Sequence, residues 1–158
     1  MKSLYVICVL VLMGWAAPGM AETASGSANM DILMQKVKAD KKLLVASNMD
    51  LSNAEAKAFW PLYEGYQKEL DQINHRLSTT ITTYAEAFNR GPIPNDTAKT
   101  LMNEVLALED AEVKLKRTYA DKISKVLPAS KTARYIQIEN KIRAIIKMEL
   151  AQQIPLLY

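Results

Sequence analysis

The chain has 158 residues, which is the length of one domain, and its formal net charge is only +3. This small charge, with few basic clusters that contain aromatic residues, disfavours binding to nucleic acid. The only cysteine, Cys8, lies in an N-terminal apolar run. The rest of the chain therefore has no thiol for a disulfide, a nucleophile or a metal ligand.

The N-terminal residues predict export. Lys2 gives a positive start, residues 4–17 are almost wholly apolar, and Gly19-Met20-Ala21 offers the small residues that a signal peptidase reads. The apolar run is short for a transmembrane span, which needs about 20 residues, and an uncleaved anchor is the alternative interpretation. We expect a signal peptide at residues 1–21, cleavage after Ala21 and a periplasmic protein.

The mature chain is expected to be all-α. Residues 22–30 are small and polar and predict a flexible N-terminal tether, and residues 31–154 predict a single all-helical domain. No run of alternating apolar and polar residues indicates a strand. A first helix is predicted at residues 31–47, with Leu33, Val37 and Leu44 on one side.

The second predicted helix is long and begins with a capping box. Ser52 is a good N-cap, and Glu55 follows three residues later. Pro61 is expected to kink the helix near Trp60 or to mark a short break. The apolar residues that follow recur at a mean step of about 3.6, the period of an α-helix; they are Phe59, Tyr63, Tyr66, Leu70, Ile73, Leu77, Ile81, Tyr84 and Phe88.

Two further helices follow. Residues 90–95 contain one glycine and two prolines and end the second helix, and Asn95 or Asp96 is expected to cap the third. Leu127 ends the third helix, and Pro128 is expected in the first turn of the fourth, which ends at Ile154-Pro155. The third apolar stripe is Leu101, Val105, Leu108, Ala111, Leu115, Tyr119, Ile123 and Val126, and the fourth is Tyr135, Ile138, Ile142 and Ile145, widened by Ile136, Ile146 and Leu150.

The second and third helices are long, similar in length and joined by six residues, so they are expected to form an antiparallel hairpin. The charge balance is −4 for residues 22–110 and +6 for residues 111–158. Much of the opposite charge is expected to meet across the hairpin, which would explain a good part of this asymmetry. Glu64, Glu69 and Asp71 would lie opposite Asp121, Lys116 and Lys114.

No catalytic or cofactor motif is found, so we expect a non-enzymatic protein without a cofactor. His75 lies off the apolar stripe and is expected to be a surface residue, and Glu139 is expected to pair with Arg143 one turn on. Met30 and Met34 are one helical turn apart and could form half of a soft-metal site. Core packing is the commoner use of methionine, and no metal site is predicted.

One motif occurs twice, and the copies are 76 positions apart. Residues 51–55, Leu-Ser-Asn-Ala-Glu, lead to Phe59, and residues 127–131, Leu-Pro-Ala-Ser-Lys, lead to Tyr135. Each copy stands just before a long helical pattern, which indicates two related helix-start units. The motif residues expected to have a structural role are Leu51, Ser52, Glu55, Phe59, Leu127, Pro128, Lys131 and Tyr135.

These repeated helix starts resemble the Leu-Thr-x-x-Gln motifs of the Spy/CpxP family of bacterial periplasmic helical proteins. The resemblance covers residues 51–150; Ser52 and Glu55 replace Thr and Gln in the first copy, and Pro128 and Lys131 replace them in the second. It implies a four-helix fold that pairs into a thin, cradle-shaped homodimer. Members of that family include envelope-stress chaperones that hold unfolded clients on a concave, partly apolar and basic face. Other members damp a sensor kinase, and relatives bind zinc or sense metals. The metal-binding histidines of those relatives have no counterpart in this chain.

A long amphipathic hairpin with few neighbours leaves apolar surface uncovered, and such patches mark interaction sites. We therefore expect an ATP-independent chaperone or stress-response adaptor that holds unfolded or partner protein segments on a partly apolar, basic surface. The alternatives are a regulatory or structural protein that binds one sensor domain or a membrane surface, and a soft-metal binder; membrane contact is not predicted. The candidate partner surface is Trp60, Tyr63, Tyr66, Arg134, Lys141 and Arg143.

Overall fold

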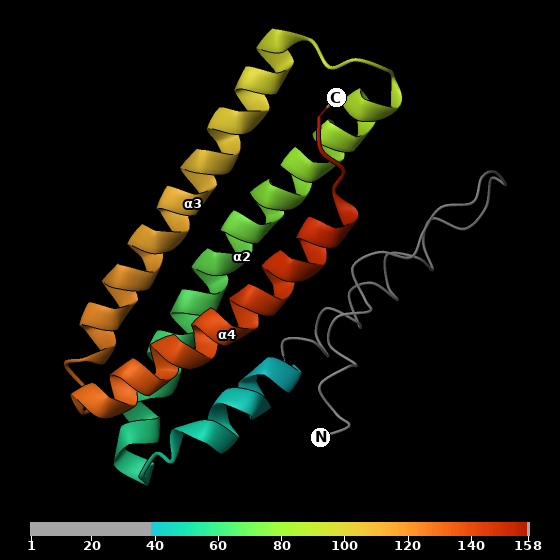
Figure 1. The fold of residues 1–158 in the computed structure, drawn as a ribbon. Coiled ribbons are helices and arrows are strands. Elements are labelled where there is room, and N and C mark those ends of the chain that lie inside the picture. The colour runs from blue at the N-terminus through green and yellow to red at the C-terminus, as the bar shows by residue number, and fades with distance from the viewer. Residues whose placement is uncertain (1–38, 158) are drawn as a thin grey trace, which may run out of the picture. The chain divides into compact units, whose positions relative to one another are not determined.

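The computed structural model describes residues 39–157. These residues form four helical segments and no strand, which confirms the all-α prediction. The segments are residues 39–49, α2 (Asn53–Asn89), α3 (Asn95–Ile123) and α4 (Ala129–Gln153) (Figure 1). The predicted signal peptide, the tether at 22–30, Met30 and Met34 lie outside the described residues. No helix in the described part combines the length and apolarity that a membrane span requires.

The described residues divide into two compact units. The hairpin unit contains residues 51–137 and 154–157, and the short-helix unit contains residues 39–50 and 138–153. Helix α4 therefore contributes its first nine residues to the hairpin unit and the rest to the short-helix unit. The single domain expected for residues 31–154 stays a prediction.

Helix α2 begins with the predicted capping box. The Ser52 hydroxyl accepts a hydrogen bond from the Glu55 backbone N–H over 3.3 Å, and the Glu55 carboxylate accepts one from the Ser52 N–H over 2.8 Å. Pro61 lies inside the helix and does not break it, so the alternative of a short break is wrong. Pro61 removes one backbone donor, but Phe59 and Tyr63 on either side of it are buried, and their packing holds the helix together.

Helices α2 and α3 pack side by side and antiparallel, which confirms the predicted hairpin (Figure 1). The loop between them contains Gly91 at φ +122°, in the region that favours glycine. The expected cap of α3 is wrong: the N-cap is Pro94, and no side chain caps the helix. The Pro94 carbonyl accepts from the Ala98 N–H over 2.9 Å, so Asn95 and Asp96 already lie in the first helical turn.

The core of the hairpin unit lies toward one end of the hairpin. Its buried apolar residues are Phe59, Tyr63, Tyr66, Leu70 and Ile73 of α2, Leu108, Leu115, Tyr119 and Ile123 of α3, and Leu127 and Tyr135. Beyond them the same stripes are less covered: Leu77, Ile81, Tyr84 and Phe88 are half-buried, and Val105 is exposed. We call the part with the buried core the closed end, and residues 80–88 with 98–106 the open end.

Gly65 sets how closely the two helices approach at the closed end. A Cβ atom at Gly65 would lie 2.8 Å from the Tyr119 hydroxyl oxygen, closer than real Cβ atoms come to other atoms. The Tyr119 hydroxyl donates to the Glu69 carboxylate over 2.7 Å. Burial and this hydrogen bond raise the pKa of Tyr119 to about 12, because both favour the neutral phenol.

The short-helix unit contains an ion pair between its two helical parts. Lys41 Nζ lies 2.9 Å from Glu139 Oε2, and the Glu139 side chain is buried. Glu139 was expected to pair with Arg143 one turn along the helix; its pairing with Lys41, which is 98 positions away, was not predicted. Val45 and Met49 are also fully buried.

Candidate functional site

The two copies of the repeated motif meet in the hairpin unit. Lys131 Nζ of the second copy donates to Glu55 Oε2 of the first over 2.7 Å, and these residues are 76 positions apart. The same carboxylate also accepts from the Ser52 backbone N–H. The pKa of Glu55 falls from its ordinary 4.5 to about 2, first because of Lys131, then because of the Ser52 N–H and hydroxyl.

The aromatic residues of the two copies are also in contact. The rings of Phe59 and Tyr135, again 76 positions apart, have centroids 5.1 Å apart and meet edge to face at 81°. Tyr63 and Tyr66 contact the same Tyr135 ring at 6.2 and 6.1 Å. The two copies of the motif therefore contact each other through two equivalent pairs, Glu55 with Lys131 and Phe59 with Tyr135. Both pairs join the start of α2 to the start of α4.

The remaining motif residues support these contacts. Leu127 is buried and Leu51 is half-buried. Pro128 was expected in the first turn of α4, but the helix begins one residue later. The Pro128 carbonyl accepts from the Thr132 N–H over 3.0 Å, so proline occupies the residue before the helix, where its own missing N–H has no helical role.

The candidate partner surface needs correction. Tyr63 and Tyr66 have exposed fractions of 3% and 2%, so both belong to the core and neither can form a partner surface. Trp60 is half-buried and meets the Phe59 ring at 5.1 Å. Amphipathic periodicity predicted which residues lie on the apolar face, but it did not show which part of that face α4 covers.

The three basic residues of the candidate surface are distributed over both units. Arg134 is exposed on the part of α4 that belongs to the hairpin unit. Lys141 is exposed and Arg143 is half-buried, and both belong to the short-helix unit. The six residues are therefore not brought together into one surface within either unit.

An apolar groove lies at the open end of the hairpin. Its volume is about 290 Å³. It is lined by Thr80, Ile81 and Tyr84 of α2, by Ala98, Leu101, Met102, Val105 and Leu106 of α3, and by Ile154 and Leu157 of the C-terminal tail. The Tyr84 hydroxyl donates to the Pro155 carbonyl over 2.7 Å and fastens the tail beside the groove.

Exposed apolar residues continue the groove along α3. Met102, Leu106 and Val113 are exposed and recur at steps of four and seven residues, which places them on one face of the helix. Sequence reasoning included Leu101 and Val105 in the apolar stripe but missed Met102, Leu106 and Val113, because they lie beside the stripe. The apolar face of α3 is wider than its contact with α2 can cover, and this excess width could have been recognised in the sequence.

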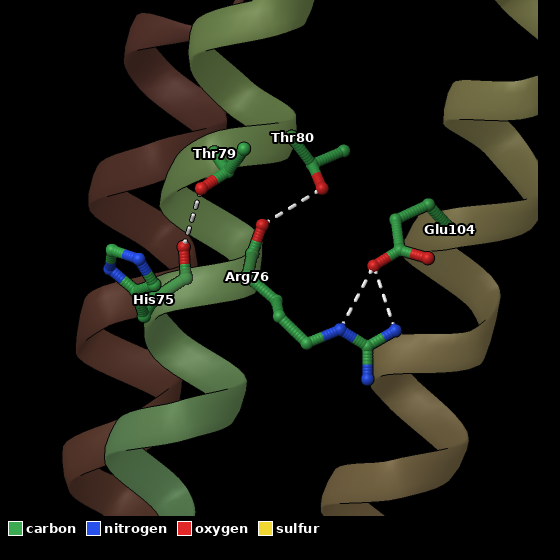
Figure 2. A network of polar contacts seen from close by, with 5 residues as sticks. All are labelled: His75, Arg76, Thr79, Thr80 and Glu104. Atoms are coloured by element: carbon green, nitrogen blue, oxygen red, sulfur yellow. Dashed lines mark hydrogen bonds and ion pairs between the residues drawn. The ribbon is translucent and has the colours of Figure 1, made fainter.

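A polar network lies next to the groove (Figure 2). Arg76 of α2 reaches across to Glu104 of α3, with its Nη2 and Nε 2.8 and 3.1 Å from Glu104 Oε1. The Thr80 hydroxyl donates to the Arg76 carbonyl over 2.9 Å. His75 is exposed, as predicted, and Figure 2 shows its ring pointing away from Glu104. Charge thus meets across the hairpin, but here the basic residue is on α2 and the acid on α3.

Within residues 39–157 no group of three or more His, Cys, Asp or Glu side chains is arranged to hold a metal ion. Comparison of the chain with protein-family models found no match. Neither the curated proteins nor the solved structures contain a match to it. The resemblance to the Spy/CpxP family stays a prediction.

Proposed function

We propose that this protein is a non-enzymatic periplasmic chaperone or envelope-stress adaptor that holds apolar segments of unfolded proteins at the open end of the α2–α3 hairpin. The observation that supports it is the contrast between the two ends. Tyr135 of α4 packs against Phe59 and covers the closed end, whereas Met102, Val105 and Leu106 remain exposed at the open end.

Burial of the exposed apolar residues at the open end favours the binding of a client segment. Burial of one Leu or Met side chain stabilises a complex by about 1.5–3 kcal/mol. A few such contacts with a segment of an unfolded chain give moderate, reversible binding once the ordering of both partners is subtracted. Met102 also has a flexible side chain that adapts to clients of different shape. Such a holding surface needs neither ATP nor a cofactor.

The periplasmic location and the homodimer are parts of the same proposal. The location rests on the predicted signal peptide at residues 1–21, and the dimer rests on the resemblance to the Spy/CpxP family. A second copy would add a second open end and so widen the apolar area offered to a client. The solution mass of the mature protein tests the dimer separately from the holding activity.

The test is the aggregation of a client protein that unfolds on reduction, followed by light scattering. The mature protein at several-fold molar excess should suppress scattering, and Leu106→Glu should weaken this by placing a charge in the apolar surface. Leu43→Glu is the matched control, because Leu43 is 68% exposed, comparable with 53% for Leu106, but belongs to the short-helix unit. No suppression by the unmodified protein would exclude the chaperone function. A pull-down dominated by one stoichiometric partner would favour a dedicated regulatory protein instead.

A further inference from the structure

The C-terminal tail lies beside the apolar groove as a short non-helical segment. Helix α4 ends at Gln153, and Pro155 cannot continue it because proline has no backbone N–H. The side chains of Ile154 and Leu157 form part of the groove lining, and the Tyr84 hydroxyl holds the Pro155 carbonyl. Figure 1 shows this last segment running beside the end of α2.

The contact that fastens the tail does not depend on its side chains. A backbone carbonyl is present at every residue of any peptide, so the Tyr84 hydroxyl can hold another extended segment in the same way. The groove lining contains no charged side chain, and apart from Thr80 its residues are apolar or aromatic. This composition favours an uncharged segment with branched apolar side chains.

The tail is only partly covered where it lies. Leu157 lines the groove but is 53% exposed, and the neighbouring Leu156 is 88% exposed. Detachment of the tail would therefore expose little additional apolar surface of these two residues to water. A segment with the same chemistry and better-fitting side chains can therefore replace it.

We propose that the groove binds an extended, uncharged, leucine-rich segment of an unfolded protein in the place of the chain's own C-terminal tail. The tail is then a displaceable strap that competes for the groove. This inference rests on the proposed function for its biological purpose, and it names the chemistry of the segment that is held. Because the tail is attached to the same chain, its effective concentration is in the millimolar range, and it weakens the binding of a free segment.

The test uses the full mature chain and a fluorescently labelled peptide with the sequence Ile-Pro-Leu-Leu-Tyr, followed by fluorescence anisotropy. Leu157→Lys removes a lining residue of the strap and should tighten peptide binding about tenfold, since the competitor is weakened. Leu156→Lys is the matched control. It places the same charge one residue away, outside the lining, and should leave the affinity unchanged.

A third variant tests whether the peptide binds in the groove. Leu106→Glu combined with Leu157→Lys should abolish the gain in affinity, with circular dichroism as the check that helix content is kept. Equal affinity for the Leu157→Lys and Leu156→Lys variants, or unchanged binding in the double variant, would overturn the inference. Light scattering with the same variants separates the two proposals. Peptide binding without suppression of aggregation contradicts the chaperone function alone, and suppression without peptide binding contradicts the strap alone.

Discussion

Lys131 and Glu55 form a 2.7 Å ion pair that joins the two copies of one short motif. The Glu55 carboxylate is also the acceptor of the capping box at the start of α2, so one side chain completes a helix cap and a tertiary contact. Four residues on from each partner, Phe59 and Tyr135 meet in the core. The repeat therefore fixes how the starts of α2 and α4 are aligned.

The first prediction concerns acid stability. The folded-state pKa of Glu55 is about 2, below its ordinary 4.5, so its contribution is fully present above pH 4.5. The contribution is lost as the pH falls from 4.5 toward 2, because the unfolded state then binds a proton that the folded state does not. We expect Glu55→Gln to lose less of its unfolding free energy than the unmodified protein over this interval, as measured by urea unfolding.

Direct titration of the Glu55 carboxyl carbon by NMR provides the control. In Lys131→Met the largest cause of the low pKa is removed, and the midpoint should move upward toward 4.5. A midpoint near 4.5 in the unmodified protein would contradict the ion pair as the structure has it.

The second prediction concerns the contact of Gly65 with Tyr119. In an exposed helix, Gly→Ala stabilises by about 1 kcal/mol, but at Gly65 the added methyl group meets the Tyr119 hydroxyl at 2.8 Å. Overpacking of this kind costs about 1–3 kcal/mol, so Gly65→Ala should lower the melting temperature.

Tyr119→Phe removes the atom in conflict, and the nearest remaining ring carbons lie 3.4 and 3.5 Å from the position of the added methyl group. In the Tyr119→Phe background we therefore expect Gly65→Ala to be neutral or stabilising. Equal destabilisation of both backgrounds would show that the hydroxyl does not set the distance between the helices.

The third prediction concerns the buried ion pair of the short-helix unit. Lys41→Met leaves the buried Glu139 carboxylate without its 2.9 Å partner, and loss of one member of a buried pair costs about 3 kcal/mol or more. Replacement of both residues, in Lys41→Met with Glu139→Gln, should cost less than Lys41→Met alone. A double-mutant cycle from chemical unfolding measures this, and strictly additive effects would show that the two groups do not interact.

The sequence was sufficient to predict the features set by local rules. The capping box at Ser52 and Glu55, the helix period and the hairpin all depend on residues that are close together in the chain. The cap of α3 was predicted wrongly because Asn95 is a good N-cap by type, whereas the proline-rich loop places Pro94 at that position. Residue type alone does not fix where a loop ends.

The candidate site could be predicted only in part. The stripe from Phe59 to Phe88 is continuous in sequence, yet Tyr66 is buried in the core and Tyr84 lines an open groove. The difference arises from which other segment lies beside each part of α2, and helical periodicity carries no information about that. The fastening of the tail by Tyr84 was not predicted, for the same reason.

The open end of the hairpin is proposed to hold segments of unfolded proteins. Methyl NMR of the mature protein, recorded while a client that unfolds on reduction is added, tests this proposal most directly. Methyl resonances of Met102, Val105 and Leu106 should shift or broaden, and those of the buried Ile123 should stay unchanged. Shifts confined to other surfaces, with Met102, Val105 and Leu106 unaffected, would contradict the proposal.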